Sequence, residues 1–133
     1  MIGTKGTMAM KLAAHHSSFS VSDAERSKAF YGGVLGLPEK QRPPHLNFPG
    51  AWYIAGPCEV HLIQTPPGVV VDTPPPELNP MARHMAFAIE DYAEGVAHFR
   101  AHGIDVLEAG PERGQFWVQD PDGHILEFIV PRG

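Results

Sequence analysis

The pattern of hydrophobic and polar positions along the chain is repeated once. The segment "HSSFSVSD" at residues 16–23 alternates small residues with large apolar ones, and so does "HMAFAIED" at residues 84–91. The two segments align without a gap at a constant offset of 68 residues, which places His16 level with His84. Alternation with a period of two is typical of a strand with one buried face. The sequence therefore predicts two equivalent strands.

A helix is expected after each of these strands. In "SDAERSKAFYGGVLGL", Ser22 and Glu25 have the spacing of a capping box, and apolar residues follow at helical intervals. Asp91 and Glu94 have the same spacing in "DYAEGVAHFRAHG", where Gly103 is placed to end the helix. Each copy of the repeat is therefore predicted to be a strand followed by a helix.

Each copy continues with further strands. Residues 50–66 and 114–131 both contain an aromatic strand, a turn rich in glycine and proline, an apolar strand and a closing proline. The turn "PDG" at 121–123 combines the fixed φ of proline with a glycine suited to the left-handed position. A weaker strand is expected after each helix, around residues 38–46 and 104–109.

These elements predict an α+β fold built from two βαβββ modules within one domain spanning residues 1–133. Module one covers about residues 13–66 and module two about residues 82–131. Between them, a proline-rich segment at about 66–80 has the composition of an extended connector. A chain of 133 residues suits one domain with a single modest core.

Strand alternation also assigns faces to the polar side chains. His16 and His84 each share a face with small residues, whereas the large apolar residues point the other way, toward the helix. In the last strand of each copy, "EVHLIQTP" and "HILEFIVP", alignment on the closing prolines places His61 level with Glu127, within about one residue. Glu127 has apolar neighbours on both sides, so its carboxylate is costly unless it is paired, hydrogen-bonded or coordinated.

If the two halves pack around a pseudo-twofold axis, His16, His61, His84 and Glu127 converge on one point. Imidazole and carboxylate groups together suit Zn, Ni, Co, Mn or Fe(II), and such a site could leave positions open for water or substrate. His61 is interpreted either as a ligand or as a hydrogen-bond donor or base beside the metal. The simpler alternative is a pair of core histidines bonded to the backbone, with Glu127 exposed at a strand end. The repeat favours the metal site.

The other histidines have simpler interpretations. His15 points away from His16 by strand alternation. His98 and His102 have the i, i+4 spacing of a helical metal site but no nearby third ligand, so they are assigned to the solvated face of the helix. His124 is assigned to the turn.

Composition narrows the classes of function. The formal net charge is −5 and no Lys/Arg cluster is present, so nucleic acid is not expected as a partner. The single cysteine, Cys58, excludes an internal disulfide and fits a reducing compartment. No apolar run is long enough to span a bilayer, and the first 14 residues lack the sustained apolar segment of a signal peptide. We therefore expect a cytoplasmic protein without a membrane partner.

These segments jointly resemble the vicinal oxygen chelate superfamily, which includes glyoxalase I, extradiol dioxygenases and metal-free bleomycin-resistance proteins. The resemblance is carried by "HHSSFSVSDAERSKAFYGGVLGL", "RPPHLNFPGAWY", "EVHLIQ" and "DPDGHILEF". It implies paired βαβββ modules whose sheets curve into an open half-barrel around a divalent metal, with ligands at His16, His61, His84 and Glu127. It also implies a homodimer, with the modules arranged within one chain or exchanged between two.

The resemblance is closest to glyoxalase-I-like proteins and implies a lyase or isomerase that acts on a small substrate with vicinal oxygens. The metal would act as a Lewis acid that stabilises an enediolate-like intermediate, and Glu127 or His61 would move the proton. Glyoxalase I usually has glutamate at both last-strand positions, so His61 departs from that pattern. Glutathione or another thiol is left open as a cofactor.

Two other functions stay open. An Fe(II)-dependent, ring-cleaving dioxygenase would use His16, His84 and Glu127 as a facial triad. A non-catalytic binding protein of the bleomycin-resistance type would hold a drug or metabolite in the same cavity. Fold alone does not decide among these functions.

Overall fold

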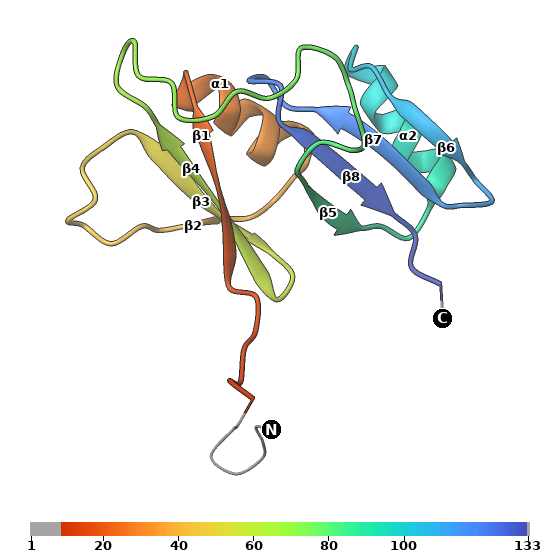
Figure 1. The fold of residues 1–133 in the computed structure, drawn as a ribbon, viewed down its shortest axis with the longest axis horizontal. Helices are drawn as coiled ribbons and strands as arrows, with labels where there is room; N and C mark the ends of the chain where they lie inside the picture. Colours follow the sequence, from red (N-terminus) through yellow and green to blue (C-terminus); the bar gives the residue numbers. More distant parts are fainter. Residues whose placement is uncertain (1–8, 133) are drawn as a thin grey trace, which may run out of the picture.

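The computed structural model describes residues 9–132, in which two modules of the same topology lie side by side (Figure 1). Module one comprises β1 (His16–Val21), α1 (Ala24–Lys28), the π-helical segment η1 (Ala29–Val34), β2 (Glu39–Lys40), β3 (Gly50–Ala55) and β4 (Cys58–Gln64). Module two comprises β5 (His84–Ala88), α2 (Tyr92–Ala101), β6 (Leu107–Gly110), β7 (Gln115–Gln119) and β8 (Ile125–Ile129). The predicted α+β fold of two βαβββ modules is confirmed.

Each module folds its strands into one mixed sheet of four, in the orders β1-β4-β3-β2 and β5-β8-β7-β6. The first and last strands of each module are parallel neighbours, with Ser18 paired to His61 in module one and Ala86 paired to Glu127 in module two. Ser18 and Ala86 are equivalent in the sequence repeat. His61 and Glu127 therefore occupy equivalent places, as the alignment of the last strands predicts.

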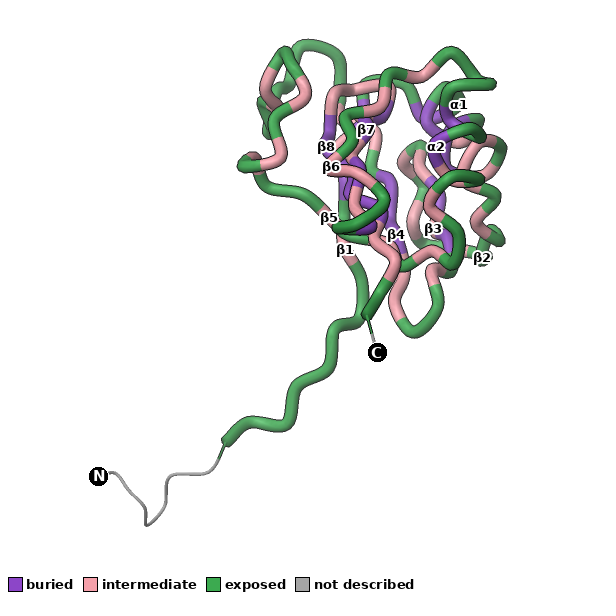
Figure 2. Tube along the Cα trace, turned by 90° about the vertical axis from the view of Figure 1, so that its right-hand side faces the viewer, coloured by how far each residue is buried: buried purple, intermediate pink, exposed green. Residues whose placement is uncertain are grey.

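The two faces of each first strand differ as the alternation predicts. In β1, Phe19 and Val21 are buried while His16 and Ser18 are exposed. The buried side chains join one hydrophobic core, in which Phe99 of α2 packs 4.8 Å from the ring of Phe128. Figure 2 shows buried residues (purple) concentrated in the strands and on the inner sides of the helices. The small-residue face is left open.

The start of α1 differs from the prediction. Asp23, not Ser22, is the N-cap, and its carboxylate accepts a hydrogen bond of 3.1 Å from the backbone N–H of Arg26. Ser22 is engaged elsewhere, because its hydroxyl donates to Asp122 of module two at 2.6 Å. A long-range partner has displaced the local capping interaction.

The second helix and the weak strands follow the sequence more closely. Asp91 caps α2 by accepting from the N–H of Glu94 at 2.9 Å, and Gly103 follows the helix with a φ of 71°. That left-handed conformation favours glycine and ends the helix. The strand after each helix is short, since β2 has two residues and β6 has four.

The turn between β7 and β8 ties module two to module one. The hydroxyl of Tyr31 donates to Oδ2 of Asp120 at 2.7 Å, and Nε2 of His124 lies 2.7 Å from the carbonyl oxygen of Ser20. Asp120 and His124 are both buried, and burial raises the pKa of Asp120 above its ordinary value. His124 therefore belongs to the turn, as predicted, but it also joins the two modules.

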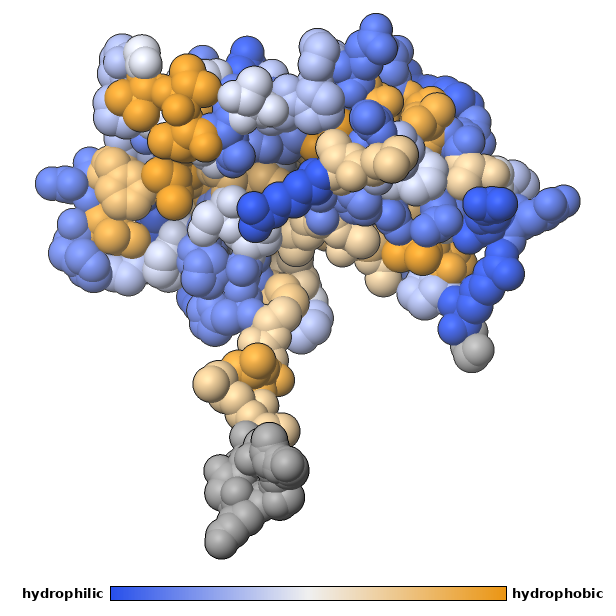
Figure 3. Space-filling model, in the orientation of Figure 1, coloured by the Kyte–Doolittle hydropathy of each residue, from blue (hydrophilic) through white to orange (hydrophobic). Residues whose placement is uncertain are grey.

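The connector at 66–80 has neither helix nor strand, as expected. It is held by hydrogen bonds from Ser20 to Asp72 and from the side chain of Gln119 to the carbonyl of Pro75. Hydrophobic atoms gather over the loop that follows β4 (Figure 3), where Val70 is exposed. No helix within residues 9–132 has the length and apolar character needed to cross a membrane.

Candidate metal centre

The first half-site, His16 and His61, lies on the open face of β1 and β4. The ring of His61 is stacked between two other rings, with its centroid 4.1 Å from that of Trp52 and 4.0 Å from that of His16. His61 is only 6% exposed. Trp52 is the residue of β3 paired with His61. The stack fixes the plane of the His61 ring.

A carboxylate that the sequence analysis did not single out completes this cluster. Oε1 of Glu59 lies 2.9 Å from Nε2 of His61, and Lys40 donates to the other carboxylate oxygen. Hydrogen bonds from His61 and Lys40 lower the pKa of Glu59 to about 2. Burial lowers the pKa of His61, while the hydrogen bond to Glu59 opposes that effect. Strand alternation offered a signal, because Glu59 and His61 are two residues apart on one face.

The second half-site, His84 and Glu127, lies on β5 and β8. Nε2 of His84 is 3.0 Å from Oε1 of Glu127, and Glu127 is only 8% exposed. Trp117 donates its indole N–H to Oε1 at 3.1 Å, and Gln115 donates to Oε2 at 3.1 Å. Both donors lie on β7, where Trp117 is paired with Glu127. The burial of Glu127 is thus compensated by hydrogen bonds.

The contacts of His84 determine which of its ring nitrogens carries a hydrogen in the neutral ring. Its Nδ1 lies 2.7 Å from the carbonyl oxygen of Ala82, which can only accept, so Nδ1 carries a hydrogen. In the neutral imidazole, Nε2 then presents a lone pair to the carboxylate of Glu127, which is also only an acceptor when ionised. A proton on Nε2 or a cation shared by the two groups removes this conflict. An imidazole oriented by a carbonyl beside a carboxylate is a donor set that fits Zn, Ni, Co, Mn or Fe(II).

The two half-sites lie on different sheets. Within the described part of the chain, no three His, Cys, Asp or Glu side chains are grouped so that they could hold a metal ion. The convergence expected for His16, His61, His84 and Glu127 therefore does not occur within one chain. Instead, His16 and His84 both lie on exposed faces of edge strands.

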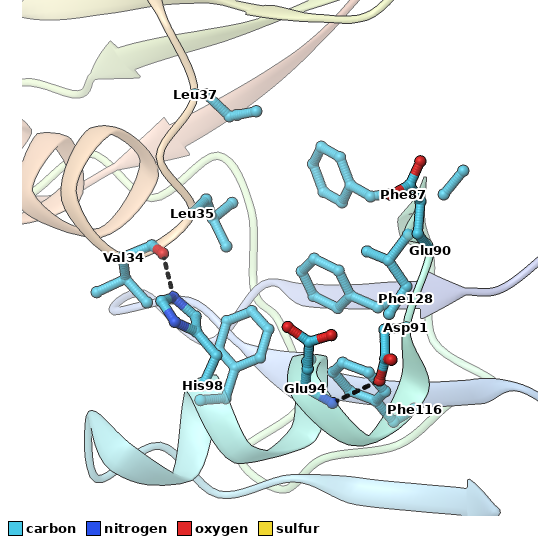
Figure 4. A pocket seen from close by; sticks show the side chains of 14 residues that line it. Val34, Leu35, Leu37, Phe87, Glu90, Asp91, Glu94, His98, Phe116 and Phe128 are labelled. Carbon is cyan, nitrogen blue, oxygen red and sulfur yellow. Dashed lines mark hydrogen bonds between the residues drawn. The ribbon is translucent and has the colours of Figure 1, made fainter. Parts of the chain in front are cut away.

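Two other histidines differ from their predicted surroundings. His15 does not point away from His16, because their Nδ1 atoms lie 2.8 Å apart. Residue 15 precedes β1, so the alternation of the strand does not govern it. His98 is exposed, as predicted, but its Nε2 donates to the carbonyl of Val34 in module one at 2.6 Å (Figure 4).

Cavities lie between the modules. One of about 300 Å³ adjoins His84, with Ser18 and Arg83 also in its wall. A larger one of about 490 Å³ lies between the end of η1 and α2, where Leu35, Phe87 and Glu94 surround it (Figure 4). None of the four candidate ligands lines the larger cavity. Of these two, the smaller one is lined by a residue of a half-site, His84.

Comparison with known proteins identifies the family. The sequence profile of the Glyoxalase/Bleomycin resistance protein/Dioxygenase superfamily matches residues 13–128, which is most of the chain. The chain belongs to this superfamily. A curated relative in this superfamily is "Glyoxylase I 4" of Arabidopsis thaliana, 30% identical over 119 residues, which cover 86% of this chain and 68% of that protein. The lactoylglutathione lyase of Escherichia coli O157:H7 is 32% identical over 122 residues, which cover 86% and 89% of the two chains.

Solved structures of superfamily members share the fold. A protein from Bacillus anthracis, described as a glyoxalase family protein, superposes with a TM-score of 0.76 at 25% identity and covers 95% of this chain and all of its own. The lactoylglutathione lyase of Agrobacterium tumefaciens superposes with a TM-score of 0.64 at 21% identity, over 89% and 92% of the two chains. These similarities show the shared fold, and the curated relatives support a distant relationship to glyoxalase I.

Proposed function

We propose that the protein is a divalent-metal-dependent lyase or isomerase of glyoxalase type, acting on a small substrate with vicinal oxygens. The observation that carries this proposal is the arrangement of the second half-site. Nδ1 of His84 is bound to the backbone, which leaves Nε2 facing Glu127 across 3.0 Å. Two groups that both present lone pairs need a cation or proton between them.

The partner in this proposal is a second copy of the chain. Each chain offers two half-sites on separate sheets, and the strands that bear His16 and His84 are sheet edges with open faces. A homodimer with twofold symmetry would bring the first half-site of one copy to the second half-site of the other, twice. This arrangement explains why candidate ligands that match in the repeat remain apart in a single chain.

In the dimer, His16, His84 and Glu127 would hold the metal, and His61 would be a fourth ligand or a base beside it. A bound divalent metal supplies Lewis-acid polarisation of substrate oxygens. Glu127 is held in one orientation by Trp117 and Gln115 and is placed to accept a proton from the substrate carbon. Trp52 stacks on His61 and keeps water from that side of its ring.

The substrate class in this proposal follows the relatives. The Escherichia coli and Salmonella typhimurium relatives, 32% and 30% identical, are lactoylglutathione lyases, so a thiol adduct of a dicarbonyl compound is the first substrate to examine. Elemental analysis of the purified protein, followed by an assay with methylglyoxal and glutathione, tests the proposal. Bound Zn, Ni, Co, Mn or Fe together with turnover supports it. Metal-free protein that is still inactive after loading with each of these ions contradicts it.

One observation favours a second candidate, an Fe(II)-dependent ring-cleaving dioxygenase. Glu59 holds Nε2 of His61, so in this candidate His61 stays beside the metal, and His16, His84 and Glu127 form a set of two histidines and one carboxylate. Such a set with open positions is typical of non-haem Fe(II) oxygenases. Oxygen uptake with a panel of catechols by the iron-loaded protein separates this function from isomerisation.

A further inference from the structure

Glu59 and His61 form a charged pair at the edge of the first half-site. They lie on the same face of β4, and Glu59 is the residue of β4 paired with His16 of β1. The side chain of Glu59 is only 15% exposed, and its two oxygens are both engaged, one by Nε2 of His61 and the other by Lys40. The carboxylate is therefore held from both ends.

This contact determines where the hydrogen of the His61 ring lies. An ionised carboxylate can only accept hydrogen bonds, so the 2.9 Å contact requires a hydrogen on Nε2. In the neutral ring, Nδ1 then carries the lone pair, and no residue among 9–132 donates a hydrogen bond to it. The stack of Trp52 and His16 on the two faces of the ring opposes a ring flip that would exchange the nitrogens.

The pattern is the reverse of that in the second half-site. There the backbone carbonyl of Ala82 holds the hydrogen on Nδ1 of His84 and leaves Nε2 as the lone-pair atom. A hydrogen-bond partner on one ring nitrogen fixes the tautomer and the orientation of a functional histidine. The two histidines thus present different nitrogens.

We propose that Glu59 is a positioning residue that fixes His61 as its Nε2–H tautomer, so that Nδ1 is the nitrogen which His61 presents to the metal or to the substrate. The proposal rests on the proposed function only in placing His61 at the reacting centre. Lys40 supports this role, because it binds the second oxygen of Glu59 and holds the carboxylate toward the ring.

The test is a long-range ¹H–¹⁵N correlation spectrum of the histidine rings in ¹⁵N-labelled, metal-free full-length protein, recorded at about pH 8, above the ordinary histidine pKa. His61 is assigned from the spectrum of His61→Gln. The expected result is a hydrogen on Nε2 of His61 in the natural protein. Glu59→Ala removes the acceptor at Nε2 and yields a mixture of the two tautomers.

A matched control is Glu108→Ala, which removes another ion-paired carboxylate, bound by Tyr92 and Arg100 in module two. It leaves the His61 signals unchanged. A hydrogen on Nδ1 of His61 in the natural protein, or an unchanged tautomer in Glu59→Ala, overturns the proposal. When Zn²⁺ is added, His61 keeps its Nε2 hydrogen, and loss of that hydrogen to the metal also overturns the proposal. Failure of the protein to bind any metal contradicts the proposed function but leaves the metal-free tautomer result standing.

Discussion

Nε2 of His84 faces Oε1 of Glu127 across 3.0 Å, while Nδ1 of the same ring is bound to a backbone carbonyl. The two side chains come from parallel neighbouring strands, and each is held by partners outside the pair. Glu127 receives hydrogen bonds from Trp117 and Gln115 of β7. The pair is therefore oriented by the surrounding protein, as the ligands of metal sites on rigid strands are.

Replacing Glu127 with glutamine removes the carboxylate charge but keeps its shape. If Glu127 is a metal ligand, we expect metal affinity to fall by more than about 100-fold. Such a loss exceeds the range seen when only a hydrogen-bond partner of a ligand is removed. Turnover falls with it. Elemental analysis after dialysis and the activity assay measure the two effects. Glu108→Gln, which alters a carboxylate bound by Tyr92 and Arg100, is the control. Full retention of metal and turnover by Glu127→Gln removes Glu127 from the site.

The indole of Trp117 acts on Glu127 through one hydrogen bond. Trp117→Phe keeps an aromatic ring but removes the N–H that lies 3.1 Å from Oε1. We expect metal affinity to fall by about 10-fold, because the ligand loses a partner that orients it. Trp52→Phe is the matched comparison, since Trp52 contacts His61 by stacking and its phenyl replacement can still stack. Competition with a metallochromic chelator measures both. Equal affinities in the natural protein and Trp117→Phe contradict this role.

The contact between Tyr31 and Asp120 joins the two modules. Tyr31→Phe removes the hydroxyl 2.7 Å from Oδ2 and leaves a buried carboxylate oxygen without this donor. We expect the free energy of unfolding to fall by about 1.5–3 kcal/mol, the range for hydrogen bonds to charged groups. Tyr53→Phe, at another buried tyrosine, should change it little, since no hydrogen bond from the Tyr53 hydroxyl occurs within residues 9–132. Urea unfolding measures both, and equal losses would assign the effect to packing alone.

The stability of the protein should depend on pH through Asp120. Because burial raises the pKa of Asp120, the folded protein retains this proton at pH values where the unfolded chain has lost it. The corresponding contribution to stability is fully present below the unfolded pKa of about 3.9 and is lost as pH rises through the higher folded pKa. The stability of the natural protein relative to Asp120→Asn should therefore fall as pH rises across this window. Urea unfolding at a series of pH values tests this, and a relative stability that rises with pH contradicts it.

The sequence predicts the repeated parts of the structure because the repeat constrains them twice. The offset between His16 and His84 identifies equivalent strands, and the alternation in each strand separates the core face from the open face. The closing prolines then place His61 level with Glu127, and the strand pairing confirms that register. Periodicity is strong evidence where one face of a strand must be buried.

Contacts between distant segments could not be predicted in the same way. Tyr31 and Asp120 are 89 positions apart, and nothing in either segment specifies the other. The same limit applies to Ser22, which has the spacing of a capping residue but donates its hydroxyl to Asp122 instead. Glu59 lies on the face of His61 by alternation, but only the folded chain brings Lys40 to its other oxygen. The local pattern of a strand predicts which face each side chain lies on, whereas its hydrogen-bond partners depend on how the modules pack.

The proposed metal site is shared between two copies of the chain, and complementation between variants tests this sharing most directly. His16→Ala and Glu127→Ala each damage one half-site, so either homodimer alone should lose its metal. When equal amounts are mixed through reversible unfolding, half of the dimers are mixed, and each mixed dimer regains one intact site. Metal content and turnover should then recover to about one quarter of the natural level, as twofold symmetry requires. If each site is instead formed within one chain, every chain in the mixture remains damaged. Metal content and turnover that stay at the level of the separate variants contradict a shared site.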